Sequence, residues 1–206
     1  QGKSEVRYRG PNITPGYWRA PAETAEHFDE EGYFCSGDAV KWIDENNLHL
    51  GLKFDGRIAE DFKLATGTFV SVGPLRAKII GSAAPYIQDV VITGLNMHEV
   101  GAMVFPNVAA CRDLSGLPPD APVEQVLASA GVHARFQGLL DHLAATATGS
   151  ANRIARMCLL AEPPTIDRGE ITDKGSINQR AVLAHRADTV AKLHADELRY
   201  IIKPTV

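Results

Sequence analysis

The sequence predicts an α+β fold in two parts, a small antiparallel β unit over residues 1–56 and a compact α+β domain over residues 57–206. Up to Gly56, short apolar runs alternate with turn-forming residues, which is typical of strands joined by turns. After Gly56, strand-like and helix-like stretches follow one another. The 206 residues are 45% hydrophobic and 22% charged, a composition typical of a globular protein with room for one domain or slightly more.

The first part is predicted to contain several strands and one short helix. A proline in the first turn indicates a helix at residues 21–28, because its fixed backbone angle suits a helix start. Residues 44–47 (Asp-Glu-Asn-Asn) form a good hairpin turn, and residues 36–38 (Ser-Gly-Asp) separate two further runs. The expected strands are residues 5–9, 33–35, 39–43 and 48–54.

The second part mixes both kinds of element. Its expected helices are residues 74–82, residues 123–146 in one long or two shorter pieces broken near Gly131, and residues 179–194. Its expected strands are residues 62–64, 68–70, 90–93, 100–105 and 154–160. This pattern predicts a single α+β domain of about 150 residues.

Charge and cysteine content exclude several classes of protein. The 21 basic and 25 acidic residues give a net charge of −4 without a block of like charges, so we expect neither nucleic acid nor a membrane surface as a partner. The three cysteines lie 76 and 47 residues apart, which fits neither a zinc site nor a disulfide framework. We therefore expect a cytoplasmic protein without a signal peptide or membrane span.

Common catalytic motifs are missing. The sequence contains no GxSxG, HExxH, GxGxxG or GxxxxGK[ST] pattern, which removes four familiar enzyme classes. The seven histidines form no i,i+3 or i,i+4 pair, so we expect them to be structural or solvated and predict no metal site.

Four residues at joints between elements could carry chemistry. Asp38 follows a Ser-Gly turn, Arg57 lies where the two parts meet, Gly67 interrupts a strand pair, and Lys174 stands in a polar loop. Taken one at a time, they fit ordinary roles better: a turn aspartate, a surface ion pair, a bulge glycine and a solvated lysine.

Taken together and in order, these segments resemble the C-terminal third of adenylate-forming enzymes. That superfamily includes acyl- and aryl-CoA synthetases, peptide-synthetase adenylation domains and firefly luciferase. The matching segments are RGPNITPGYW with GYFCSGD (residues 9–18 and 32–38), DGR through KLATGTFV (residues 55–70), and GEITDKG (residues 169–175). The last two are most similar to feruloyl-CoA synthetases of phenylpropanoid degradation. The resemblance implies a mobile C-terminal lid domain after the end of a large N-terminal domain.

The resemblance also implies a role for each residue. Asp38 would accept hydrogen bonds from both ribose hydroxyls of ATP, and Arg57 would contact the nucleotide beside the hinge. Lys174 would be the catalytic lysine that bridges the acyl carboxylate and the α-phosphate. Lys63 and Gly67 would belong to the loop that replaces this lysine after domain rotation and lines the CoA channel. The implied cofactors are ATP, CoA and Mg²⁺, and the partners are a small carboxylic acid and the chain's own N-terminal domain.

Two departures from the family pattern affect these roles. The hinge position two residues after Arg57 is Ala59, and Lys174 is shifted by about three positions from the usual place. The phosphate loop, adenine-binding segment and acid pocket have no counterpart here, so we expect a fragment of an acid–thiol ligase that is inactive alone. An adenylation domain that loads a carrier protein, a luciferase-type enzyme and a non-catalytic α+β interaction module stay open as alternatives.

Overall fold

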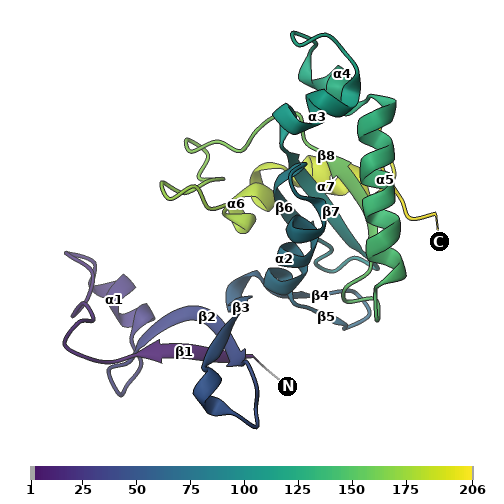
Figure 1. Cartoon of the computed structure of the whole chain (residues 1–206). Helices are drawn as coiled ribbons and strands as arrows, with labels where there is room; N and C mark the ends of the chain where they lie inside the picture. The colour runs from purple at the N-terminus through teal and green to yellow at the C-terminus, as the bar shows by residue number, and fades with distance from the viewer. Residues whose placement is uncertain (1–2, 206) are drawn as a thin grey trace. The chain divides into compact units, whose positions relative to one another are not determined.

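The computed structural model describes residues 3–205, which divide into two compact units (Figure 1). The first unit ends at Asp61, and the second begins at Phe62. The expected division after residue 56, between the end of a large domain and a mobile C-terminal domain, stays a prediction.

The first unit is a three-stranded antiparallel sheet in the order β1-β2-β3 with one short helix. Its elements are β1 (Ser4–Tyr8), α1 (Pro21–His27), β2 (Phe34–Trp42), the 3-10 turn η1 (Leu48–Leu50), β3 (Leu52–Arg57) and the 3-10 turn η2 (Ile58–Glu60). The helix begins at the proline, as predicted.

The expected separation of two strands at residues 36–38 is wrong. These residues lie inside β2, where the pairing with β3 shifts between Asp38 and Val40. Gly37 has a φ of +72°, which glycine adopts without the penalty of other residues. The strand therefore continues through an irregularity that sequence patterns read as a turn.

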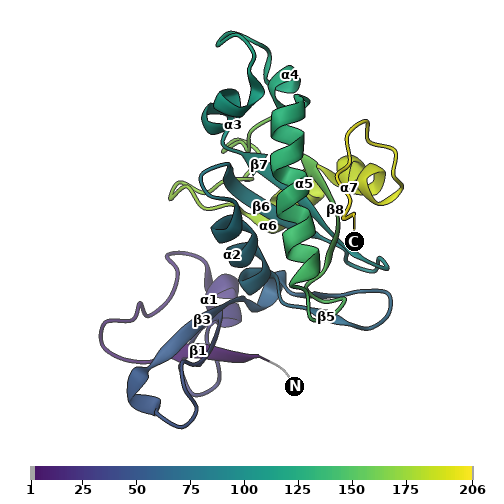
Figure 2. The ribbon, with the colours of Figure 1, turned by 45° about the vertical axis from the view of Figure 1, so that its right-hand side comes forward.

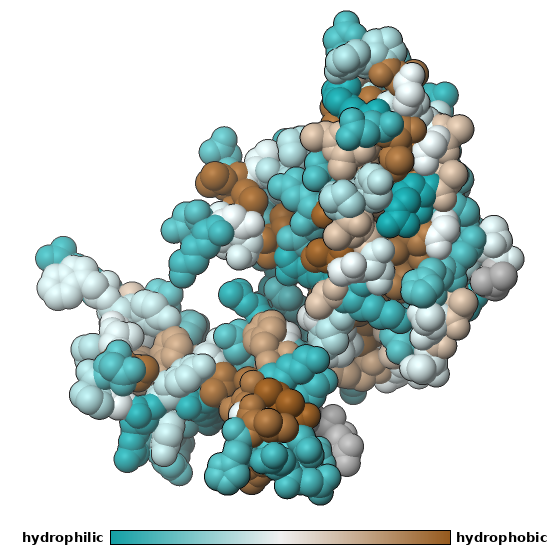
Figure 3. Space-filling model, viewed as in Figure 1, coloured by the Kyte–Doolittle hydropathy of each residue, from teal (hydrophilic) through white to brown (hydrophobic). Residues whose placement is uncertain are grey.

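The β2–β3 hairpin has an apolar face and a charged face. Val40 pairs with Phe54 and Trp42 with Leu52, whereas the intervening pair is Lys41 with Lys53. The first unit's only buried hydrophobic residue within the described chain is Ala39. Figure 3 shows a brown, hydrophobic patch over the first unit. The large hydrophobic side chains left exposed around the hairpin are Trp42, Ile43, Leu48, Leu50, Leu52 and Phe54.

The second unit contains a three-stranded sheet in the order β6-β7-β8 and a separate two-stranded hairpin. Strands β6 and β7 pair antiparallel, whereas β7 and β8 pair parallel. The elements are β4 (Phe62–Lys63), β5 (Phe69–Val70), α2 (Val72–Ala83), β6 (Ile87–Thr93), β7 (Val100–Pro106), α3 (Val108–Ser115), α4 (Val123–Leu127), α5 (Ala130–Ala145), β8 (Ile154–Leu159), α6 (Gln179–His185) and α7 (Ala187–His194).

Helices cover both faces of this sheet (Figures 1 and 2). Strand β7 is buried along its whole length, as expected for a central strand between two layers. Its Val104 belongs to the cluster that includes Phe136 of α5, and its Met103 to the cluster that includes Leu193 of α7. The second unit thus has a core on each side of the sheet, and the predicted α+β class is confirmed.

Three helix predictions differ in detail. The region expected at residues 123–146 is two helices, which was one of the two alternatives. The single helix expected at residues 179–194 is wrong, because α6 ends before Arg186 and α7 starts after it. Helix α3 was not expected; the Asn107 side chain caps its start by accepting a hydrogen bond from the Ala110 N–H at 3.3 Å.

Candidate functional site

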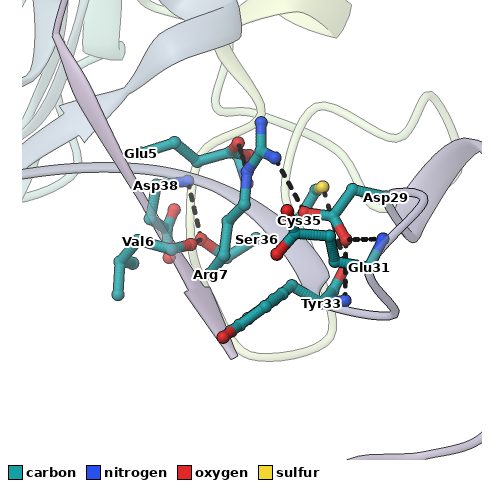
Figure 4. Close-up of polar contacts among 10 residues, drawn as sticks. Glu5, Val6, Arg7, Asp29, Glu31, Tyr33, Cys35, Ser36 and Asp38 are labelled. Carbon is teal, nitrogen blue, oxygen red and sulfur yellow. Dashed lines mark hydrogen bonds and ion pairs between the residues drawn. The ribbon is translucent and has the colours of Figure 1, made fainter. Parts of the chain in front are cut away.

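Asp38 lies in the first unit at the irregularity of β2, where hydrogen bonds to β1 brace the backbone (Figure 4). The Ser36 hydroxyl donates to the Val6 carbonyl at 2.6 Å and accepts from the Asp38 N–H at 3.1 Å. Glu5 accepts from the Gly37 N–H at 2.9 Å. Both residues before Asp38 are therefore tied to the neighbouring strand.

A series of ion pairs between side chains links Glu5 to the turn after α1. Arg7 donates through Nε to Glu5 at 2.8 Å and through its terminal nitrogen to Asp29 at 2.9 Å. The Arg7 hydrogen bond, aided by the Gly37 N–H, lowers the pKa of Glu5, and the Tyr33 N–H is the main cause of a lowered pKa at Asp29. Both carboxylates therefore remain ionised acceptors near neutral pH.

Arg57 lies directly opposite Asp38 in the β2–β3 pairing. Its Nε is 3.8 Å from Asp38 Oδ1, and the two side chains are 68% and 39% exposed. A pair this exposed contributes little to stability. The structure therefore brings two of the expected nucleotide-binding residues together at the surface and leaves carboxylate lone pairs available for further donors.

Ion pairs lie on either side of Arg57. Lys3 Nζ is 2.7 Å from Asp61, whose side chain is 2% exposed, and 3.7 Å from Asp55. Lys41 contacts the other oxygen of Asp55 at 2.6 Å. The expected hinge position Ala59 and its neighbour Arg57 thus lie between two aspartates that are anchored within the first unit.

Lys63 and Gly67 lie in the β4–β5 hairpin of the second unit. The Gly67 N–H donates to the Leu64 carbonyl at 2.8 Å, and Gly67 has a φ of +81° with open space where a Cβ would stand. The hairpin also bonds to the turn between β6 and β7, because the Asn96 N–H donates to the Lys63 carbonyl at 3.1 Å. Phe62, at the start of the hairpin, lines an apolar cavity of about 230 Å³.

Lys174 lies at the exposed tip of a small finger, residues 170–178, between β8 and α6. An isolated bridge joins Ile171 to Ile177, and the Gly175 N–H donates to the Thr172 carbonyl at 2.9 Å to close the turn. In Figures 1 and 2 this segment and the β4–β5 hairpin lie apart on the second unit.

The contacts that hold these groups could not be predicted from the sequence. The sequence predicts a polar loop at Glu170, yet this side chain is fully buried and bound by Arg186. The contacts of Glu5 and Ser36 have no sequence signal, because nothing in a strand pattern shows which neighbour a polar side chain meets. Among residues 3–205, no group of three or more His, Cys, Asp or Glu could hold a metal ion. Within residues 3–205, none of the helices has the length and hydrophobicity of a membrane span.

No protein-family model matches the chain. It is 22% identical over 200 residues to the long-chain-fatty-acid–[acyl-carrier-protein] ligase AEE15 of Arabidopsis thaliana, covering 94% of this chain and 25% of that one. It is 32% identical over 109 residues to human long-chain-fatty-acid–CoA ligase 1, covering 52% of this chain and 15% of the ligase. The adenylation domain of a carboxylic acid reductase from Segniliparus rugosus superposes with a TM-score of 0.71 at 23% identity, over 95% of this chain and 28% of that structure.

Together these similarities place the chain in the adenylate-forming superfamily of acyl-CoA and acid ligases, as a match to the C-terminal portion of its members. The chain spans a quarter or less of the length of the two relatives.

Proposed function

We propose that the chain is the C-terminal part of an ATP-dependent carboxylic acid:CoA ligase that forms an acyl-adenylate and then an acyl-CoA thioester. The observation that carries this proposal is that the segment between β8 and α6, which holds Lys174, and the β4–β5 hairpin, which holds Gly67, lie on separate parts of one unit (Figure 1). An enzyme that uses a lysine in one half-reaction and a glycine loop in the other needs the two to be presented separately.

In the first half-reaction, a carboxylate oxygen of the acid attacks the α-phosphorus of ATP, and pyrophosphate leaves. The Asp38 carboxylate would accept hydrogen bonds from the ribose hydroxyls, and Arg57 would contact the nucleotide beside it. The Lys174 ammonium would offset the negative charge that develops on the phosphate and the leaving group. Its exposed position at a projecting tip suits a group that must reach a substrate bound elsewhere.

In the second half-reaction, the CoA thiolate attacks the acyl carbonyl, and AMP leaves. Lys63 and Gly67 would line the path of the pantetheine chain, since glycine lets the backbone come close to a ligand. The apolar cavity that Phe62 lines beside this hairpin supports the assignment. The residues described here offer no acidic cluster for Mg²⁺, so we assign no step to that ion.

The first unit supports the proposal that the chain works as part of a longer ligase. Trp42 is 44% exposed, Leu52 47% and Phe54 60%, on one face of the same hairpin. Burying such a side chain fully is worth about 1.5–3 kcal/mol, and an unpaired face of this kind marks a contact surface. We assign that face to the large domain of the same enzyme, with domain rotation about residues 57–60.

The acid we propose is an aromatic one, ferulate, because residues 55–70 and 169–175 resemble feruloyl-CoA synthetases. Transfer to a carrier protein is the second candidate, and it is favoured by the similarity to an acyl-carrier-protein ligase over 94% of this chain. Supplying the intact enzyme with feruloyl-adenylate and either CoA or a phosphopantetheinylated carrier separates the two, since only the true acceptor yields a thioester.

The decisive experiment measures the two half-reactions of the intact enzyme separately. Lys174→Ala should cut adenylation, followed as ATP–pyrophosphate exchange, by at least about a hundredfold and spare thioester formation from supplied feruloyl-adenylate. Lys192→Ala is the matched control, because Lys192 is an exposed lysine paired with Asp188 on α7. Equal losses in both half-reactions would contradict the assignment. The 206-residue chain alone, given ATP, CoA and ferulate, should release neither AMP nor thioester.

A further inference from the structure

The segment that carries Lys174 has little regular structure to fix it. Between the end of β8 at Leu159 and the start of α6 at Gln179, the chain forms turns and the short finger bridged at Ile171 and Ile177. Ordering such a segment costs conformational entropy at every residue. A lysine that acts at a defined point in space therefore needs contacts that hold the root of the finger.

Those contacts converge on one buried ion pair. The side chain of Glu170 is fully buried and that of Arg186 is 8% exposed. Arg186 Nε donates to one oxygen of Glu170 at 2.8 Å, and a terminal nitrogen donates to the other at 2.9 Å. This two-point geometry fixes the orientation of both groups. The pair also lowers the pKa of Glu170, so the carboxylate stays ionised near neutral pH.

The same two side chains bind the start of the segment. Arg186 donates to the carbonyl of Glu162 at 3.0 Å and to that of Pro163 at 3.0 Å. Glu170 accepts from the Thr165 N–H at 3.1 Å. The Arg186 guanidinium also lies 5.0 Å from the ring centre of Phe105 in β7. One pair thus ties the start of the segment, the root of the finger and the central strand to the end of α6.

Two backbone hydrogen bonds connect Glu170 to the part of the finger that carries Lys174. The Asn178 N–H donates to the Glu170 carbonyl at 2.9 Å, and the Thr172 N–H donates to the Ser176 carbonyl at 2.9 Å. Ile177 is 6% exposed and anchors one side of the finger in the core beside α6 and α7. A displacement of Glu170 would therefore also displace Lys174 at the tip of the finger.

A buried ion pair is a poor way to gain stability, because desolvation of both charges opposes their attraction. An apolar pair of similar volume would fill the same space. The pair is therefore better explained by the position in which it holds the finger than by a gain in stability.

We propose that the Glu170–Arg186 pair positions Lys174 for adenylation. Neither residue is assigned a contact with substrate; they act through the backbone of the finger. This inference rests on the proposed function, because it needs Lys174 to be the adenylation lysine.

The first test uses the 206-residue chain and the rate of trypsin cleavage after Lys174. Glu170→Gln should raise that rate at least about tenfold by freeing the finger, with Arg186→Lys as a milder second variant should the first fail to fold. Glu162→Gln is the matched control, since it removes an exposed carboxylate, 3.5 Å from Arg168, in the same segment. Leu143→Ala, a change in the other core cluster, should leave this cleavage unchanged. Unchanged cleavage in both variants of the pair would overturn the proposal.

The second test uses the intact ligase. Arg186→Lys should lower the kcat of adenylation about tenfold to a hundredfold, with the KM for ATP and thioester formation from supplied adenylate unchanged. It should cause no further loss in a Lys174→Ala background. If Lys174→Ala abolishes adenylation and Arg186→Lys does not affect it, the positioning role is refuted. If Lys174→Ala has no effect, the proposed function fails, while the cleavage test still reports whether the pair holds the finger.

Discussion

Gln179, the first residue of α6, is 1% exposed, and its Oε1 accepts a hydrogen bond from the Ile92 N–H at 3.1 Å. Strand β6 is at the edge of its sheet, so no neighbouring strand can accept from this N–H on the outer side. Gln179→Leu keeps the volume and removes the acceptor. A buried N–H without a partner costs about 1–3 kcal/mol of the free energy of unfolding, which lowers Tm by about 2–12 °C in a chain of this length.

The assay is chemical unfolding followed by circular dichroism, with amide hydrogen exchange to report on Ile92 itself. Gln88→Leu is the matched control, because Gln88 is an exposed glutamine in the same strand. We expect the control to change the free energy of unfolding by less than about 0.5 kcal/mol. In Gln179→Leu the Ile92 N–H should exchange faster than in the control. Equal stability of the two variants, with no faster exchange, would refute the idea that this side chain closes the sheet edge.

Two further predictions concern single positions of the second unit. Gly131→Ala should lower the free energy of unfolding by about 1–3 kcal/mol, because the new Cβ would stand 2.1 Å from the Leu114 carbonyl oxygen. Gly138→Ala in the same helix meets open space and should raise the free energy of unfolding by about 0.5–1 kcal/mol. Thermal unfolding of the two variants distinguishes these outcomes. Burial, aided by repulsion from Arg156, lowers the pKa of His194, so the unfolded chain protonates first as the pH drops. The contribution of neutral His194 to the free energy of unfolding should therefore be fully present above about pH 6.5 and be lost as the pH falls from there through the lowered pKa. In unfolding titrations at successive pH values, His194→Gln should reduce this loss of stability.

The sequence predicts the elements of the second unit well, because a core on both faces imposes strong patterns. The run Val100–Phe105 is apolar throughout, and it forms the buried central strand β7. The hairpin around Gly67 follows from its glycine and the flanking apolar residues. The class of fold and the superfamily could both be predicted this way, since they depend on patterns and motifs that are local in sequence.

Features that depend on distant residues could not be predicted. The break between α6 and α7 occurs at Arg186, whose side chain is drawn inward by a carboxylate 16 residues earlier. The apolar periodicity around it continues and so predicts one helix. Helix α3 escapes prediction for a different reason, because it has only eight residues and Cys111 is the only one of them that is buried. Residues 36–38 look like a turn, since the hydrogen bonds that keep them in β2 come from another strand.

Each unit holds its own proposed functional group by contacts within that unit. Ser36 holds the Asp38 N–H, and Glu5 holds the N–H of the preceding Gly37, within the same sheet. Under our proposal Lys174 is positioned through Glu170, which lies at the root of its own finger. None of these contacts crosses from one unit to the other. Under the proposed function the second unit must present two different faces to the same substrate in turn, and groups held by contacts between units would lose their geometry with each rotation. Local bracing of each group is therefore what a two-step ligase requires, and variants of Glu5 should affect the nucleotide site while leaving trypsin cleavage after Lys174 unchanged.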